Sequence, residues 1–155
     1  MGLPEVQRFF AEKKLPNKII IMEEDTATVA TAAAALGREP GEIAKTLAFG
    51  LKDGRVAVVV AMGTARIDNR KFKECFGCKA AMLSYEDTLA RTGHPVGGVC
   101  PFGLPAEVEI CLDVSLKKYE TVFPAAGTPH SAVPFTPAEL EAATGGRWVD
   151  VCKED

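Results

Sequence analysis

The sequence predicts a single α+β domain of about five helices and seven short strands. Three observations predict this class. The 155 residues fit one domain, 1–155, without a long linker or an internal repeat. Helical and strand patterns alternate at short spacing along the chain. Hydrophobic residues make up 47% and charged residues 25%, values that exclude a disordered chain and a coiled coil.

The first third of the chain carries clear signals for helix starts and stops. Pro4 suits the first position of a helix, and Gly37 suits the residue that follows one. Pro40 can begin a further helical turn. The expected elements are a helix from Pro4, a strand over 19–22, an Ala-rich helix over 28–36 and a turn over 40–43.

The middle of the chain is expected to form a β-hairpin followed by two capped helices. Two strand-like runs are joined through Asp53-Gly54, a pair typical of hairpin turns. Asp68 and Ser84 each precede a helical pattern as N-cap residues. The expected elements are strands over 46–51 and 55–62, a helix over 68–76, a strand over 80–83 and a helix from 84 that Gly93 ends.

The last third combines short elements with two shaped loops. Prolines and glycines crowd residues 94–103 and 126–130, so both stretches are predicted to be loops. Thr136-Pro137 with Glu139 is a strong helix start. The remaining elements expected are strands over 108–112, 121–124 and 148–151 and a helical turn over 115–119.

Charge and hydropathy narrow the function classes. The net charge of −3 argues against broad nucleic-acid binding, although residues 66–79 hold five basic side chains against two acidic ones. The longest apolar run, 56–62, is too short to span a membrane. The N-terminus lacks an apolar signal core, so we expect a cytoplasmic protein.

The cysteines are the first candidates for chemistry. Their odd number, five, predicts reduced thiols in a chain without a leader. Cys75, Cys78, His94 and Cys100 have a spacing like that of a zinc site, but a predicted strand and helix interrupt it, so we expect no metal. Cys100 is either a nucleophile paired with a histidine or a small thiol that fills its loop, and the second is favoured.

Two further features are candidates for substrate binding. Gly97-Gly98 either aims backbone N–H groups at an oxygen or forms a tight turn, and no nucleotide-binding glycine motif is present. Lys45 stands at the mouth of the strand-like run 46–49. Its ammonium either serves a function or reaches solvent past its apolar stem.

Taken together, several motifs in order resemble the YbaK-type aminoacyl-tRNA editing domains. The resemblance covers roughly residues 24–145, nearly the whole chain. The motifs are residues 28–37 with 40–47, then 92–103 with a G-x-x-x-P loop at 97–101, then Asp113, Leu116 and 126–131.

Such domains are similar to the insertion domain of bacterial prolyl-tRNA synthetases. The resemblance implies a mixed, mostly antiparallel, curved sheet with helices packed around it. It implies a trans-editing hydrolase that deacylates mischarged tRNA, chiefly tRNA for proline carrying alanine, cysteine, serine or threonine. It implies no metal and no cofactor. The implied partners are the tRNA and, transiently, prolyl-tRNA synthetase, for a monomer or weak dimer with no membrane association.

The resemblance also assigns roles to residues of this sequence. Lys45 would position the ester and the 3′ end, while Gly97 and Gly98 would belong to the loop that holds the aminoacyl-adenosine end. Residues 66–79 either form a solvated helix face, the favoured reading of a single charge run, or contact the implied tRNA through Arg70, Lys71 and Lys73. The substrate-binding residues expected are Thr28, Thr46, Val99, Cys100, Pro101, Phe102, Gly127 and His130.

The implied chemistry needs few protein groups. An aminoacyl ester is activated, so its hydrolysis requires little more than orientation and a stabilised oxyanion. Water, or a neighbouring group of the substrate, can therefore attack without a protein nucleophile. The alternative is a non-catalytic binding module that keeps the pocket for a nucleotide or aminoacyl-like ligand. The presence of Lys45 favours the enzyme.

Overall fold

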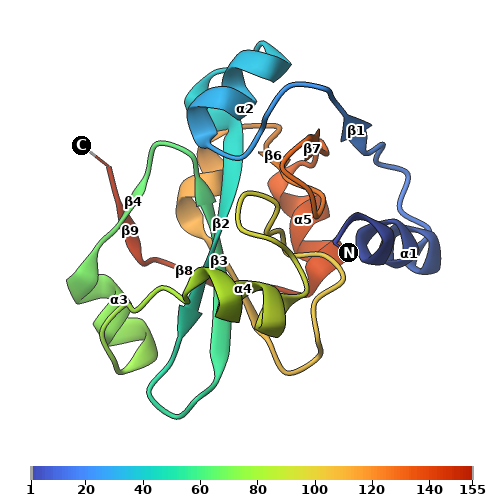
Figure 1. Cartoon of the computed structure of the whole chain (residues 1–155). Coiled ribbons are helices and arrows are strands. Elements are labelled where there is room, and N and C mark those ends of the chain that lie inside the picture. The colour runs from blue at the N-terminus through green and yellow to red at the C-terminus, as the bar shows by residue number, and fades with distance from the viewer. Residues whose placement is uncertain (1, 155) are drawn as a thin grey trace.

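The computed structural model describes residues 2–154 and shows a central five-stranded sheet with helices on both sides (Figure 1). The sheet order is β6-β2-β3-β5-β8, and two short two-stranded sheets flank it. The strands are β1 Ile20–Ile21, β2 Ile43–Gly50, β3 Val56–Met62, β4 Arg66–Ile67, β5 Glu109–Asp113, β6 Phe123–Pro124, β7 Ser131–Ala132, β8 Arg147–Val149 and β9 Cys152–Lys153.

In the part of the chain that the structure describes, five α-helices form where the sequence signals predict them, which confirms the helical part of the expected α+β fold. Thr28, Asp68, Ser84 and Thr136 each accept a hydrogen bond from the first turn of the helix that follows. The helices are α1 Leu3–Lys13, α2 Val29–Leu36, α3 Asn69–Phe76, α4 Tyr85–Thr92 and α5 Pro137–Thr144, with 3₁₀ turns η1 Pro40–Glu42 and η2 Val114–Lys118.

The expectation of a mostly antiparallel sheet is wrong for the central sheet. Only the β2–β3 hairpin is antiparallel there, while β2–β6, β3–β5 and β5–β8 are parallel. The chain reaches β5 and β8 through long crossovers that contain helices, and such crossovers are what parallel strands require. Local sequence signals identify a hairpin, but they do not report which distant strands become neighbours.

The strand count also differs from the expected seven, because nine strands form within residues 2–154. The strands β4, β7 and β9 were not expected, and each is two residues long. β7 pairs with β1 and β4 pairs with β9, in both cases between segments far apart in sequence. The strand expected over 80–83 is reduced to one isolated bridge between Phe49 and Met82. β2 begins at Ile43 instead of Thr46, because Ile43 and Ala44 pair with β6.

The central sheet separates two parts of the core. Leu47 and Phe49 of β2 pack on the side of α3, where the Phe49 and Phe72 rings lie 4.8 Å apart. Ala44 belongs to the core on the other side, with residues of α1 and α5. Because successive side chains of a strand point to opposite faces, Thr46 lies on the side of Ala44 and Lys45 on the side of α3.

Candidate functional site

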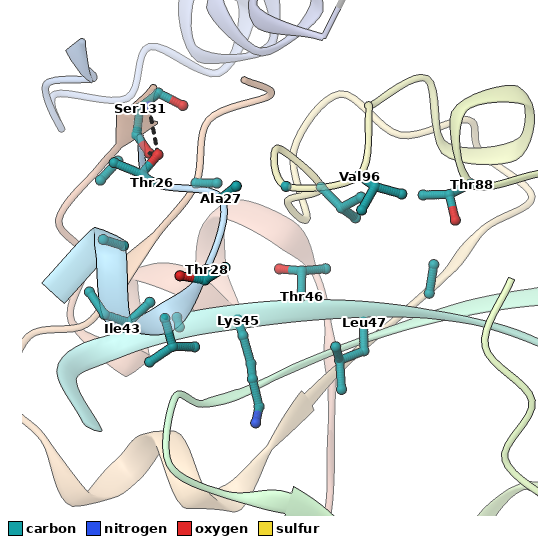
Figure 2. A pocket seen from close by; sticks show the side chains of 18 of the residues that line it. Thr26, Ala27, Thr28, Ile43, Lys45, Thr46, Leu47, Thr88, Val96 and Ser131 are labelled. Carbon is teal, nitrogen blue, oxygen red and sulfur yellow. Dashed lines mark hydrogen bonds between the residues drawn. The ribbon is translucent and has the colours of Figure 1, made fainter. Parts of the chain in front are cut away.

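A cavity of about 520 Å³ opens beside β2, on the side of the sheet away from α3 (Figure 2). Its floor is formed by residues 43–48 of β2. Its walls come from residues 26–29, from the glycine loop at 96–99 and from residues 123–132. The N-terminal part of α4 with the preceding residues 82–83 completes the mouth. Segments more than one hundred residues apart in sequence therefore enclose one space.

Hydrogen bonds hold two of these walls together. Thr26 Oγ1 donates to the Ser131 carbonyl oxygen over 3.2 Å, and the Ser131 backbone N–H donates back to Thr26 Oγ1 over 3.1 Å (Figure 2). The Thr26 backbone N–H also donates to the Pro129 carbonyl at 2.6 Å. Ser131 Oγ in turn accepts from the Ala126 N–H at 3.0 Å. The two walls are thus positioned by buried polar groups that satisfy one another.

The glycine loop approaches these walls too closely for any side chain at two positions. A Cβ on Gly98 would lie 2.6 Å from the Thr128 backbone nitrogen. Gly97 has a φ of +92°, and its Cβ would lie 2.9 Å from that of Ala27. The Gly98 N–H donates to the Pro95 carbonyl at 2.9 Å and closes a turn, so Gly97 is the glycine that faces the cavity.

Thr46 supplies an unpaired polar atom in the cavity. Its side chain points from β2 into the open space, between the wall at 26–28 and the loop at Val96 (Figure 2). Thr46 Oγ1 is buried and has no hydrogen-bond partner within the described residues. Because an unpaired buried hydroxyl is costly, this atom is a candidate contact for a ligand.

Lys45 points to the opposite side of the sheet from Thr46 (Figure 2). Its Nζ donates to the Gly63 carbonyl oxygen at 3.2 Å and to the carbonyl of Ala65. Burial lowers the pKa of the Lys45 ammonium from its ordinary value. Lys45 is the third residue of β2 and not the residue before the strand. It is among the residues that line the cavity, but its ammonium points away from the side of Thr46 (Figure 2).

Three residues expected in the site lie behind the glycine loop instead of in the cavity. Cys100 Sγ lies 3.6 Å from Nε2 of the buried His94, and burial raises the pKa of the Cys100 thiol to about 12. Phe102 stacks on Phe135 at 5.2 Å and accepts a hydrogen bond from His94 Nε2 through its carbonyl. The side chains of Cys100 and Phe102 join the core that contains α1, and Pro101 between them is also buried.

The third motif is close to the cavity but contributes only part of its lining. His130 is exposed, and its Nδ1 donates to the Glu24 carbonyl oxygen at 3.0 Å outside the cavity. Gly127 packs against Gly2, where a Cβ would lie 2.5 Å from the Gly2 carbonyl carbon. Thr28 caps α2 and also lines the cavity. Val99 lines the cavity as well.

A family comparison assigns this architecture. The sequence model of the aminoacyl-tRNA editing domain matches residues 23–143. This chain belongs to that family. The match spans the cavity floor, the glycine loop and the wall at 126–132, so every segment that encloses the cavity lies within the editing domain. The resemblance drawn from the sequence motifs is therefore confirmed.

Individual relatives of the editing domain agree with this assignment. An uncharacterized protein of Bacillus subtilis (strain 168), YwhH, is 44% identical over 99% of both chains. A solved structure of a candidate trans-editing enzyme for prolyl tRNA synthetase has a TM-score of 0.89 and 30% identity, covering 98% of this chain and 97% of that one. The proline–tRNA ligase of Pelobacter propionicus is 31% identical over 60% of this chain, which corresponds to 16% of the ligase.

The three basic residues expected to contact tRNA, Arg70, Lys71 and Lys73, lie on α3, across the sheet from the cavity. Arg70 and Lys73 are exposed, and Arg70 Nε lies 3.6 Å from Glu74. Lys71 Nζ instead pairs with Asp150 at 3.1 Å and donates to the Cys152 carbonyl.

The editing domain does not assemble the cysteine and histidine residues with zinc-like spacing. Cys75 and Cys78 pack beside the α3 core, while Cys100 and His94 lie in the core behind the glycine loop. Among residues 2–154, no group of three or more His, Cys, Asp or Glu side chains is placed to hold a metal ion. The same part of the chain contains no helix long and apolar enough to cross a membrane.

Sequence reasoning missed several residues that line the cavity. Val96 belongs to a loop that was singled out, but nothing in its spacing distinguishes it from its neighbours. Leu47 and Ser131 fall inside motifs of the resemblance, but no role in the site follows for them from the sequence. The others lie in segments without a motif, so no sequence signal marks them. These missed lining residues are Thr26, Ala27, Leu47, Met82, Leu83, Tyr85, Thr88, Val96 and Ser131.

Proposed function

We propose that this editing domain is a trans-editing hydrolase that deacylates mischarged tRNA, with tRNA for proline carrying a small wrong amino acid as its substrate. The observation that carries the proposal is the cavity itself. It has a volume of about 520 Å³ and a largely apolar lining, it contains the unpaired Thr46 hydroxyl, and a glycine backbone forms one wall. A small aminoacyl group needs such a space, and family membership supplies its chemical context.

The proposed reaction breaks the ester between the amino acid and the terminal ribose. The oxygen of a water molecule attacks the ester carbonyl carbon, the bond to the ribose oxygen breaks, and the proton from water passes to that oxygen. The products are the free amino acid and uncharged tRNA. The chain orients the ester and excludes bulk water, since an activated ester needs little further assistance.

The positions of the cysteine and histidine side chains argue against a protein nucleophile. The Cys100 thiol is buried behind the glycine loop, and its raised pKa of about 12 keeps it protonated at neutral pH. His130 hydrogen-bonds outside the cavity and does not approach Cys100, which pairs with His94 instead. Attack by water, or by a neighbouring group of the substrate, is the route that this arrangement supports.

Editing is useful where one binding site cannot reject a near-isostere. A synthetase pocket distinguishes substrates that differ by a methylene or hydroxyl by only roughly 10–200-fold. Alanine, cysteine, serine and threonine are the small residues proposed as cargo. Because such an activity serves translation, we place it in the cytoplasm, with prolyl-tRNA synthetase as a transient partner.

A deacylation panel tests the proposal. Purified protein is incubated with tRNA for proline charged with each of the four small amino acids, and with correctly charged tRNA as control. The proposal expects the loss of at least one mischarged species above the spontaneous rate, with the correct one spared. No acceleration for any species in the panel would contradict it.

One observation favours the alternative, a non-catalytic binding module. Lys45 supplies the only charged side chain among the cavity-lining residues within 2–154, and its ammonium is bound to carbonyl oxygens across the sheet. A cavity without an available charge suits binding of a neutral ligand. In the same panel, absent hydrolysis with retained adenosine binding would support this module.

A further inference from the structure

The mouth of the cavity carries an unusual concentration of exposed apolar side chains. Tyr85, Met82 and Val96 are 66%, 63% and 48% exposed, and all three line the cavity. They are three of the five large hydrophobic residues that stand out as exposed within residues 2–154. Large apolar side chains gathered at one opening indicate a binding surface more often than chance exposure does.

These three side chains come from different segments that the tertiary structure brings together. Met82 is held at the edge of β2 by its bridge to Phe49. Tyr85 is the first residue of α4, which Ser84 caps. Val96 stands on the glycine loop, across the opening from Thr46 (Figure 2). The rim is thus fixed to structured elements, and its apolar surface continues directly into the cavity.

Charge at the rim selects the kind of group that fits there. Glu86 and Asp87 follow Tyr85 in the first turn of α4 and are exposed. Two carboxylates beside Tyr85 disfavour a phosphate at this place. A flat, uncharged heterocycle meets no such penalty, and it can stack on a tyrosine ring and contact a methionine side chain.

We propose that Tyr85 and Met82, with Val96 opposite, form a stacking site for the terminal base of the tRNA acceptor end while the attached aminoacyl group occupies the cavity. This inference rests on the proposed function, because it places the nucleotide that carries the ester. Bases of single-stranded ends are commonly recognised by stacking on aromatic side chains. The base lies at the rim, the ribose at the mouth and the ester near Thr46.

Two synthetic ligands isolate the contribution of the base. The first is an aminoacyl-adenosine analogue with an amide in place of the ester, and the second is the same compound without its adenine. Calorimetric titration compares their affinities for the wild-type protein and for Tyr85→Ala, Tyr85→Phe and Met82→Ala. Ile21→Ala is the matched control, since Ile21 is 60% exposed and does not line the cavity.

The expected result is a loss confined to the ligand that has a base. Tyr85→Ala should weaken binding of the adenine analogue by about 5- to 150-fold and leave that of the base-free analogue unchanged. Tyr85→Phe keeps the ring face and should retain the wild-type affinity. Met82→Ala should weaken the adenine analogue alone, and Ile21→Ala should change neither ligand.

Several outcomes would overturn the inference. They are equal binding of the two analogues by the wild-type protein, no measurable binding of either, and wild-type affinity of Tyr85→Ala for the adenine analogue. A dimer in sedimentation that Tyr85→Ala dissociates without altering adenine affinity would assign the rim to self-association instead. The proposed hydrolysis is judged separately by the deacylation panel, so base-dependent binding without hydrolysis refutes the enzyme and leaves the stacking site.

Discussion

Thr46 Oγ1 and Lys45 Nζ belong to adjacent residues but lie on opposite sides of the central sheet. The two side chains point in opposite directions from β2 (Figure 2). The hydroxyl has no hydrogen-bond partner among residues 2–154, and the ammonium is bound to the carbonyl oxygens of Gly63 and Ala65. This relationship separates a group available to a ligand from one already used by the fold. It makes the two residues the sharpest test of the candidate site.

Thr46→Val is expected to raise stability while it lowers deacylation. Valine keeps the shape of threonine but removes the unpaired buried hydroxyl, so the free energy of unfolding should rise by about 1 kcal/mol. Loss of one neutral hydrogen bond to the substrate should reduce kcat/KM by roughly 2- to 13-fold. Denaturant unfolding and single-turnover deacylation measure the two effects.

Thr88→Val is the matched control for that experiment. Thr88 also lines the cavity, but its Oγ1 donates to the Ser84 carbonyl at 2.7 Å. Removal of this satisfied hydroxyl should lower stability, which is the opposite sign. If Thr46→Val instead destabilised the protein and left kcat/KM unchanged, Thr46 would be a structural residue and not a ligand contact.

Lys45→Ala is expected to destabilise the fold. It removes the donor to two carbonyl oxygens, so the free energy of unfolding should fall by about 1–3 kcal/mol. The family resemblance separately predicts a loss of 10²–10³ in deacylation, the usual effect of removing a donor to the transition state, and predicts that Lys45→Arg also fails. Both quantities are measured well below the melting temperature of the variant.

The two effects of Lys45 can be told apart. A destabilised Lys45→Ala protein that deacylates at the wild-type rate would restrict Lys45 to holding the 63–65 turn. Unchanged stability with a large loss of turnover would show that the ammonium works on the cavity side when substrate is bound. Wild-type values for both would contradict each role.

The buried His94 should make stability fall at acid pH. Burial lowers its pKa below the ordinary value of 6.5, so the folded protein holds the neutral imidazole. As the pH falls through about 6.5, the unfolded chain takes up a proton before the folded one does, and stability decreases by up to about 1.4 kcal/mol per pH unit until the lower folded pKa is reached.

Replacement of His94 separates its contribution from that of the carboxyl groups. Denaturant unfolding of wild-type protein and of His94→Gln is compared between pH 7 and the onset of acid unfolding. His94→Gln should be less stable at neutral pH but should show a flatter decline. Parallel curves for the two proteins would mean that His94 does not contribute to the acid sensitivity.

The exposed basic residues of α3 should carry part of any phosphate contact with tRNA. Arg70→Ala with Lys73→Ala should weaken tRNA binding and reduce its salt dependence by about one unit of slope per lost contact. Lys71→Ala should also lower stability, because Lys71 pairs with Asp150 and the Cys152 carbonyl. An unchanged slope would move the contact elsewhere, with Lys13, Lys14 and Lys18 as the next group to replace.

The protein is expected to contain no stoichiometric zinc. The four residues with zinc-like spacing lie in two separate parts of the core, with Cys75 and Cys78 far from the Cys100–His94 pair in the packing. Elemental analysis of protein purified without chelator should show well under one zinc per chain. A value near one zinc ion per chain would contradict this, because a four-ligand site binds zinc tightly enough to keep it through purification.

The sequence by itself determined the local elements and the family. Capping residues such as Asp68 and Thr136 mark helix starts because their side chains bond backbone N–H groups two or three residues away. The same short range makes Asp53-Gly54 a hairpin signal. The ordered motifs identified the editing domain. Gly97 and Gly98 stand where a Cβ would meet Ala27 and the Thr128 backbone, while their role in the site stays a prediction.

Only the tertiary structure decided which groups meet in the cavity. The start of β2 at Ile43 follows from its pairing with the distant β6, and that start places Lys45 inside the strand with its ammonium directed across the sheet. The parallel neighbours of the sheet, the Thr26–Ser131 contact and the rim of Met82 and Tyr85 likewise join segments far apart in sequence. Such contacts form because distant residues bury surface together. The spacing of residues along the chain does not indicate which distant segments will do so.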